Sequence, residues 1–275
     1  MTKRTATIIL NRNLPQVADQ LYEALERSSS RYTDIYIVEA GTDGDKLSRH
    51  CAWWADWEDA TKYGLRTPRG FNYGLCQLWK EGKFKNYDFF FLLTNDTEFN
   101  GAPVIEILSE EMDNHTRVGI LSPCSKRWGE AQLLGPGRTK YFWYVQNVAL
   151  MMRRSFVESV MHVDDPNYMN FLYDGNNFRG YCADLELVIK GYANDWATAI
   201  TTKLYAEENE AYLRTKADLI KTDSFEENIR KYVNEGRTWM RNKYGFNSHW
   251  MMQKYAKFMY ETFFEYYSDL KTYSI

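Results

Sequence analysis

One segment constrains the fold of this chain more than any other. Residues 87–93 read YDFFFLL, the most strongly apolar run in the sequence, and the polar stretch Thr94-Asn95-Asp96-Thr97-Glu98 follows directly. A short, continuous apolar run of this kind is typical of a strand that is buried on both faces. Such strands belong to parallel sheets that are covered by helices on both sides. The segment therefore predicts a central strand of an α/β sheet, with amide and carboxylate side chains at its carboxyl end.

The N-terminal segment supports this fold class. Residues 5–10 form a β-branched apolar run, Pro15 opens a pattern with helical spacing, and residues 35–38 form a second apolar run. A strand, helix, strand order with short links favours parallel pairing through a right-handed crossover. We predict further helices over 70–79, 103–112, 155–161 and 184–190, and further strands over 118–121 and 141–152. Residues 122–140, rich in Gly and Pro, are predicted to form one long functional loop.

The sequence changes character after about residue 200, where charged segments with helical spacing begin. We therefore predict an α/β domain over residues 1–200 and a C-terminal helical extension over residues 201–275. The last predicted helix, residues 248–270, carries two aromatic stripes: Met251, Tyr255, Phe258, Phe263, Tyr266 and Leu270 on one, and Tyr260, Phe264 and Tyr267 on the other. Two stripes favour burial against protein over a one-faced membrane anchor. We expect this helix to pack within the chain or to form a homodimer.

Composition and motifs exclude several classes of function. The net charge is −3 and the basic residues are spread along the chain, which argues against a nucleic-acid partner. No GxGxxG, Walker or GxSxG motif occurs, so neither a dinucleotide or P-loop site nor a hydrolase nucleophile is expected. The four cysteines are isolated, and no stretch reaches the roughly 18 apolar residues of a membrane helix. We expect a cytoplasmic protein with reduced thiols, at most peripheral at the inner membrane face.

The acids that follow the central predicted strand suit a metal site. Asp96 and Glu98 are two residues apart, and in an extended segment such residues point to the same side. Carboxylate oxygens are ligands that Mg²⁺ and Mn²⁺ prefer, and these ions also bridge to diphosphate oxygens. Open α/β sheets bind ligands beyond the carboxyl ends of their strands. Spacing alone leaves a second interpretation equally open, in which Asn95, Asp96 and Thr97 form a turn that caps the next helix.

Two further groups of acids are candidates for function. Asp184 lies near the start of a predicted helix, where free backbone N–H groups would keep its carboxylate ionised and available as a base. Taken alone, a simple helix cap is the favoured interpretation of this residue. Glu39, Asp43 and Asp45 follow the second predicted strand. They could accept hydrogen bonds from a base or a ribose, or form a turn.

Taken in order, these segments resemble the GT-A glycosyltransferases, and in particular the inverting glycosyltransferase family 2. The resemblance covers residues 5–197 and rests on six segments: ATIILNRN, IYIVEAGTDGD, GFNYGLCQLW, FFFLLTNDTEF, VQNVALMMRRSF and GYCADLELVIKGYANDW. It implies a GT-A type, Rossmann-like mixed sheet that is mostly parallel and flanked by helices.

The resemblance also implies roles for individual residues. Asp96 would bind the metal with Glu98 as a second ligand, and Asp184 would be the catalytic base. The nucleotide sugar would contact Asn11, Glu39, Asp43, Asn72, Asn95 and Asp96. In the loop 122–140, Trp128 and Arg138 would bind the acceptor. Thr94 departs from the family pattern because an earlier acid of the metal motif often lies there, and Ala183 replaces the acid next to Asp184.

The function implied is transfer of a sugar from a UDP- or dTDP-linked donor to a glycan or lipid-linked acceptor, assisted by Mn²⁺ or Mg²⁺. The two departures leave open a catalytically inactive protein of the same fold that binds a sugar or a nucleotide sugar. A sugar-nucleotide pyrophosphorylase is disfavoured, because residues 11–15 after the first predicted strand contain no Gly.

Overall fold

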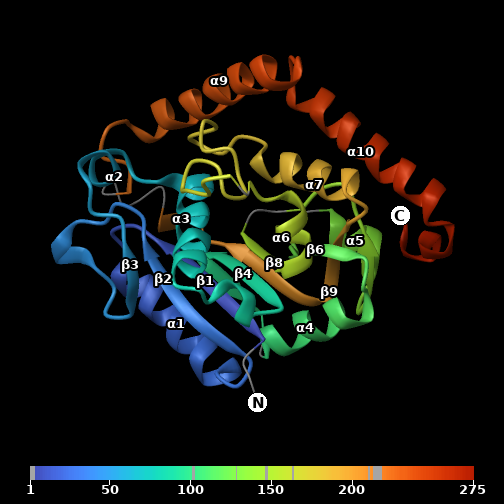
Figure 1. The fold of residues 1–275 in the computed structure, drawn as a ribbon, viewed down its shortest axis with the longest axis horizontal. Coiled ribbons are helices and arrows are strands. Elements are labelled where there is room, and N and C mark those ends of the chain that lie inside the picture. The colour runs from blue at the N-terminus through green and yellow to red at the C-terminus, as the bar shows by residue number, and fades with distance from the viewer. Residues whose placement is uncertain are drawn as a thin grey trace.

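Strand β4 (Phe89–Thr94) lies in the middle of a nine-stranded mixed sheet, as its apolar sequence predicts (Figure 1). The computed structural model describes residues 4–100, 103–127, 129–145, 148–162, 164–209, 211–212 and 219–275. Residues 89–93 are at most 1% exposed. The remaining strands are β1 (Thr5–Asn11), β2 (Thr33–Glu39), β3 (Cys51–Trp54), β5 (Thr97–Phe99), β6 (Val118–Cys124), β7 (Thr139–Tyr141), β8 (Ala149–Arg153) and β9 (Ala197–Glu208).

The strand order β3-β2-β1-β4-β8-β6-β9-β5 gives a mostly parallel sheet, and β7 pairs with β9 at its side. The β3, β2, β1 and β4 strands are parallel neighbours, and β6 is parallel to β9. The β8 strand runs antiparallel to both β4 and β6, and β5 and β7 run antiparallel to β9. The carboxyl ends of β1, β2 and β4 therefore meet at one edge. This topology confirms the predicted α/β class and the parallel crossover.

Helices cover both faces of the sheet (Figure 1). The α1 and α4 helices pack on one face, and α3, α6 and α7 pack on the other. The α9 and α10 helices form an arc outside α7 (Figure 1). The helix bounds are α1 (Pro15–Ser29), α2 (Glu58–Tyr63), α3 (Arg66–Lys80), α4 (Val104–Asn114), α5 (Glu130–Leu134), α6 (Arg154–Val160), α7 (Ala183–Ala193), α9 (Phe225–Tyr244) and α10 (His249–Tyr266), with 3-10 turns η1 (Gly44–Lys46), η2 (Phe84–Asn86) and η4 (Ser268–Tyr273).

A glycine sets the close approach of α3 to the sheet. A Cβ atom on Gly74 would lie 2.9 Å from Cγ2 of Ile8 and 3.0 Å from Cγ2 of Val38. Both distances are too short for carbon atoms in ordinary contact, so a larger residue would push α3 away from β1 and β2. The glycine of the Asn-x-Gly element therefore serves helix–sheet packing.

Two predictions about the second half of the chain need correction. Residues 122–140 are not one long loop, because β6 continues to Cys124, and α5 and β7 follow within the same range. Ser122 and Pro123 extend the pairing with β9 at Ile200 and Thr201. Likewise, the strand predicted over 141–152 is divided between the end of β7 and β8.

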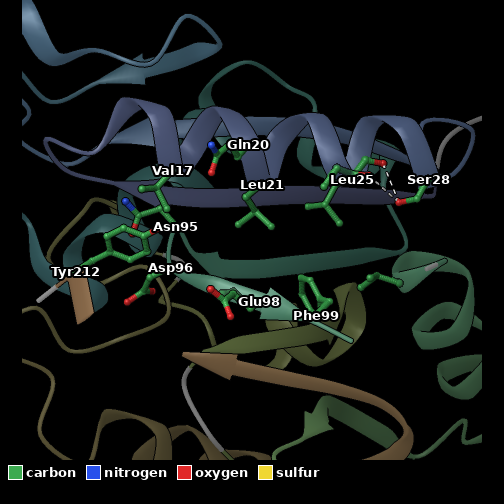
Figure 2. Close-up of a pocket in the computed structure, with 13 residues that line it drawn as sticks. Val17, Gln20, Leu21, Leu25, Ser28, Asn95, Asp96, Glu98, Phe99 and Tyr212 are labelled. Atoms are coloured by element: carbon green, nitrogen blue, oxygen red, sulfur yellow. Dashed lines mark hydrogen bonds between the residues drawn. The ribbon is translucent and has the colours of Figure 1, made fainter. Parts of the chain in front are cut away.

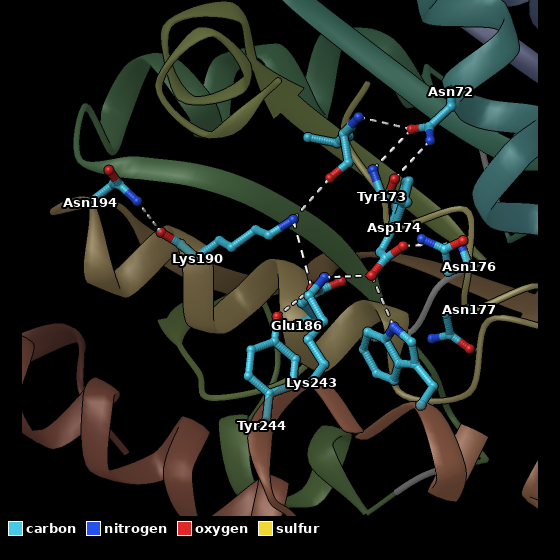
Figure 3. A network of polar contacts seen from close by, with 12 residues as sticks. Asn72, Tyr173, Asp174, Asn176, Asn177, Glu186, Lys190, Asn194, Lys243 and Tyr244 are labelled. Carbon is cyan, nitrogen blue, oxygen red and sulfur yellow. Dashed lines mark hydrogen bonds and ion pairs between the residues drawn. The ribbon is translucent and has the colours of Figure 1, made fainter. Parts of the chain in front are cut away.

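The domain boundary predicted at residue 200 falls inside β9, which continues the sheet to Glu208. The helical extension therefore begins after β9. An ionic network around the buried Glu186 attaches it to the rest of the chain (Figure 3). Lys243 of α9 lies 2.8 Å from Oε1 of Glu186 on α7 and 2.6 Å from Oδ2 of Asp174, and Tyr244 also donates to Glu186.

The C-terminal helix α10 packs within the chain through Tyr260 and Phe264 of one aromatic stripe. Both are buried, and their rings contact Tyr192 and Tyr141 at 5.8 and 6.1 Å. Of the other stripe, Phe263 is also buried, with its ring 5.4 Å from that of Tyr192, whereas Met251, Tyr255, Phe258 and Tyr266 are exposed. Packing within the chain is thus confirmed, and a homodimer through the exposed residues stays a prediction. Among the described residues, no helix is both long and apolar enough to cross a membrane.

Candidate functional site

Two adjoining cavities lie at the carboxyl ends of the central strands. The first, which we call the strand-end pocket, has a volume of about 220 Å³. It is lined by Leu10, Asn11, Arg12, Leu14, Ala40, Arg66, Thr67, Thr94, Asn95, Asp96, Arg179, Glu208, Tyr212, Leu219 and Ile220. The second, which we call the α1 groove, has a volume of about 510 Å³ and runs between α1 and β5 (Figure 2). Asn95, Asp96 and Tyr212 line both cavities, so Asp96 stands where they meet.

Asp96 is a buried acid without a cationic partner. The residue is 7% exposed, and among the described residues no ion pair involves its carboxylate. Burial raises the pKa of Asp96, and the nearby charge of Glu98 raises it further, whereas a hydrogen bond with Thr94 lowers it. The Asp96 carboxylate is thus placed where a bound cation would stabilise its charged form.

Glu98 lies on β5 and lines the α1 groove together with Asp96 (Figure 2). It is exposed, and its Oε1 accepts a hydrogen bond of 2.7 Å from Asn209. Asp96 itself stands in the turn Asn95-Asp96 between β4 and β5 and not in an extended segment. The turn of the second interpretation is therefore present, but Pro103 is the cap residue of α4, and no side-chain hydrogen bond caps that helix. The described residues contain no group of three or more His, Cys, Asp or Glu that could hold a metal by themselves. Two carboxylates nonetheless fit an ion such as Mg²⁺, which proteins bind through one or two carboxylates together with substrate phosphates and water.

A chain of buried side chains holds the strand ends together behind Asp96. The amide of Asn11 donates to Oε2 of Glu39 at 2.9 Å, and its Oδ1 accepts from Asn95 at 2.6 Å. Glu39 also accepts from Thr42 and, at 2.8 Å, from the backbone of Ser48. This chain connects the carboxyl ends of β2, β1 and β4.

The structure does not support direct nucleoside contact by Glu39. The residue is fully buried, and three side-chain and backbone donors already occupy its carboxylate. Burial raises the pKa of Glu39, while the hydrogen bonds from Thr42, Ser48 and Asn11 lower it. Glu39 therefore positions Asn11, which does line the strand-end pocket.

Asn72, the second residue expected at the nucleotide, is likewise fully buried in the scaffold (Figure 3). Its amide group donates to the carbonyls of Tyr168 at 3.1 Å and Tyr173 at 2.8 Å. Its Oδ1 accepts from the backbone N–H groups of Leu172 and Tyr173, both at 2.9 Å. Two donors and two acceptor positions are the full capacity of an amide side chain. Asn72 therefore fixes the segment 168–173 and has no capacity left for a ligand.

Asp43 is held by hydrogen bonds with Asn13 and Lys221. Its backbone N–H donates to Oδ1 of Asn13 at 2.9 Å, and Lys221 donates to its carboxylate. The hydrogen bond from Lys221 is the largest influence on the pKa of Asp43, which is lowered. Asp43 does not line the strand-end pocket.

Asp184 is the second residue of α7 and not its cap, a position that Cys182 occupies without a side-chain hydrogen bond. Burial raises the pKa of Asp184 to about 6, and hydrogen bonds from the N–H groups of Leu185 and of Asp184 itself lower it. Asp184 lines neither the strand-end pocket nor the α1 groove. Burial raises the pKa of the nearby Tyr232, and the charges of Asp184 and Glu208 raise it further.

The structure places one of the two expected acceptor-binding residues. Trp128 lies outside the described residues. Arg138 is exposed next to β7, where its backbone N–H donates to Oγ1 of Thr202 at 2.9 Å. It lines neither the strand-end pocket nor the α1 groove.

Three arginines in the strand-end pocket were missed by the sequence analysis. Arg12 follows β1, Arg66 begins α3, and Arg179 comes from the segment before α7. Arg12 could have been noticed, because it stands in the polar loop that ends the first apolar run. Arg66 and Arg179 carry no local signal, since only the fold brings them to β4.

Comparisons with known proteins agree with this fold. The chain matches no protein-family model and no curated protein sequence. In structure it is similar to residues 1–349 of TarS from S. aureus, with a TM-score of 0.51 and 10% identity over 87% of this chain and 73% of that one. The same TarS piece in complex with UDP gives a TM-score of 0.50 at 9% identity, over the same shares of the two chains.

A second similar structure is that of GalNAc-T7 with UDP, GalNAc and Mn²⁺, with a TM-score of 0.50 and 10% identity over 99% of this chain and 58% of that one. Against a longer TarS chain, this protein spans 45% of the length. Likeness at such low identity bears on architecture alone. With the mostly parallel sheet and the cavities at its strand ends, it shows that the chain has the GT-A fold of glycosyltransferases.

Proposed function

We propose that this protein is an inverting glycosyltransferase that moves a sugar from a nucleoside diphosphate to an acceptor hydroxyl. The observation that carries the proposal is Asp96, a buried carboxylate at the end of the central strand, where two cavities meet. Among the described residues it has no cationic partner. Open α/β sheets bind their ligands at such strand ends. Uncompensated buried acids cost stability, so they are typically retained for binding or catalysis.

The donor would lie across the strand-end pocket with its diphosphate near Asp96. A divalent cation, Mn²⁺ or Mg²⁺, would neutralise charge on that diphosphate when bound. Asp96 and Glu98 supply carboxylates toward such an ion. Asn95 orients the strand end through its hydrogen bond with Asn11.

Asp184 is the proposed base. With a pKa of about 6, its carboxylate is largely ionised at neutral pH and still basic enough to accept a proton. It would take the proton from the acceptor hydroxyl, whose oxygen attacks the anomeric carbon on the face opposite the diphosphate. The bond from the anomeric carbon to the diphosphate oxygen breaks, and its electron pair stays on that oxygen. The sugar is therefore transferred with inversion.

We propose a UDP- or dTDP-linked donor and a glycan or lipid-linked acceptor. The similar structures of TarS and GalNAc-T7 that hold UDP support a uridine nucleotide. The Mn²⁺ in the GalNAc-T7 structure supports a divalent cation.

The test is a thermal-shift panel of nucleotide sugars with and without Mn²⁺, on the wild type, on Asp96→Ala and on Asp164→Ala. Asp164 is an exposed acid outside both cavities and serves as the matched control. We expect at least one UDP- or dTDP-sugar to raise the melting temperature of the wild type and of Asp164→Ala. Asp96→Ala should lose the Mn²⁺-dependent part of that rise. If no nucleotide sugar stabilises the wild type, the proposal is wrong.

Thr94 and Ala183 favour one second candidate, an inactive protein that binds nucleotide sugars. Each stands where the family pattern has an acid. A turnover assay separates the two functions: a transferase releases nucleoside diphosphate when acceptor is present, and a binding protein shows affinity without release.

A further inference from the structure

The strand-end pocket gathers more positive charge than its neighbours compensate. Arg12, Arg66 and Arg179 all line it. Phe178 lies beside two of these guanidinium groups, with its ring centre 5.7 Å from Cζ of Arg66 and 5.5 Å from Cζ of Arg179. Like charges held close together destabilise a fold unless an opposite charge joins them. The question is which of these arginines already has an anionic partner.

Arg179 has its partners within the chain. Its guanidinium lies 2.9 Å from Oδ2 of Asp223 and also pairs with Glu235. Its Nε donates to Asn228 at 3.2 Å. Arg179 therefore forms part of the pocket wall, and its positive charge is largely compensated by these two carboxylates.

Arg66 is the opposite case. Among the described residues its guanidinium makes no hydrogen bond and no ion pair, and its Nε is buried without an acceptor. Its pKa is lowered to about 10, chiefly by burial and also by the charges of Arg179 and Arg12, against a smaller opposing effect of Asp223 and Glu235. Its backbone has φ of +57°, a left-handed conformation that costs energy for a residue with a side chain. The chain thus holds an arginine in an unfavourable conformation and leaves its donors unused.

Arg12 resembles Arg66 in that it has no carboxylate partner among the described residues. Its terminal nitrogens donate to backbone carbonyls, at 2.9 Å to Leu219 and 3.0 Å to Thr61. Its Nε is buried without an acceptor. Burial is the main influence on its pKa, which is lowered, with only a weaker opposing effect from Asp43. Carbonyl partners fix the direction of the side chain and leave its charge uncompensated.

Resting on the proposed function, we propose that Arg12 and Arg66 bind the diphosphate of the donor directly, without a metal ion between them. A guanidinium offers a planar fork of donors that matches phosphate oxygens in pairs. When the bond to the anomeric carbon breaks, the diphosphate gains negative charge, and these two cations are fixed in place to stabilise it. Because Thr94 stands in place of an acid of the metal motif, the chain offers a metal ion fewer ligands. The two arginines would supply part of the positive charge that neutralises the diphosphate.

The test is the affinity of UDP, UMP and uridine measured by calorimetry in EDTA. The wild type should bind UDP more tightly than UMP, and UMP more tightly than uridine. Arg66→Asn removes the charge with a residue that tolerates the left-handed backbone, so the fold should be retained. It should lose roughly tenfold or more in affinity for UDP and leave uridine unchanged, because only the phosphates meet the guanidinium. Arg66→Lys should recover part of the loss, and Arg230→Ala, an exposed arginine on α9, should bind as the wild type does.

Two outcomes would overturn the inference and leave the proposed function standing. One is a wild type that binds UDP with Mn²⁺ but not in EDTA. The other is an Arg66→Asn variant that is folded and binds UDP in EDTA with wild-type affinity. A wild type that binds no nucleotide under either condition instead removes the proposed function and the inference with it.

Discussion

Replacing Asn72 by alanine tests whether this residue holds the scaffold or contacts the nucleotide. The amide makes four hydrogen bonds with the backbone of residues 168–173, at 2.8 to 3.1 Å. Each hydrogen bond contributes about 1 kcal/mol net, so losing all four costs about 4 kcal/mol of unfolding free energy. In a protein of this size, that loss corresponds to a fall in melting temperature of about 10 °C. The cost is a large part of a typical total stability of about 5–15 kcal/mol.

The measurement is urea unfolding in the absence of nucleotide, followed by circular dichroism. The matched control is Asn194→Ala, whose amide makes a single exposed hydrogen bond of 2.8 Å with the carbonyl of Lys190. We expect the control to lose about 1 kcal/mol or less. An Asn72→Ala protein with wild-type stability and weakened UDP binding would refute our reasoning, because only a ligand contact gives that combination.

Two further predictions concern the base and the C-terminal helix. Because burial raises the pKa of Asp184 to about 6, the carboxylate is protonated as pH falls below that value, and transfer should slow roughly tenfold per pH unit there. Asp184→Asn should bind UDP normally and lose most transfer, and retained activity would place the base elsewhere. The exposed face of α10 should form a homodimer, because its first half carries Lys254 and Lys257 and its second half Glu261 and Glu265, and these opposite charges meet when two copies pair antiparallel. Light scattering should show a dimer for the wild type and a monomer for the double substitution Trp250→Ser and Phe258→Ser, whereas a monomeric wild type would contradict this.

The fold was predictable because a single physical condition, burial on both faces, determines the sequence of its central strand. Residues 89–93 are buried by helices on both faces, which leaves no position for a polar side chain. The same rule placed Asp96, since the chain must leave such a strand at the ligand-binding edge. The domain boundary predicted at residue 200 lies too early in the chain. The apolar residues of β9 end before the strand stops pairing with its neighbours. Residues 206–208 still pair with β5, and buried residues alternate with more exposed ones from Lys203 to Ala206.

The resemblance of motifs predicted where polar residues stand in the sequence, but not which partners their side chains contact. Glu39 and Asn72 stand at positions where the resemblance implies ligand contacts, yet both are fully buried and saturated with hydrogen bonds. A polar residue at a strand end or on the inner face of a helix has two possible partners, the ligand or the backbone of a neighbouring segment. Sequence cannot distinguish them, because the partner of Asn72 is a hundred residues away in the chain. Arg66 is the opposite kind of case: it lines the same pocket as Asp96, yet nothing near it in the sequence indicates a functional residue.

The arrangement of opposite charges in the strand-end pocket is the strongest physical argument for a charged, two-part ligand. Asp96 and Arg66 line the same small cavity, yet no hydrogen bond or ion pair between them occurs among the described residues. A protein that needed only stability would gain by pairing them, because Asp96 is buried, Arg66 is half-buried, and neither has an oppositely charged partner among the described residues. Here the Glu39–Asn11–Asn95 chain fixes the strand end that carries Asp96 through neutral donors, and the backbone at Arg66 is held in a left-handed conformation. Both charges thus stay available, and a ligand that brings a cation to Asp96 and phosphate oxygens to Arg66 would satisfy the two together.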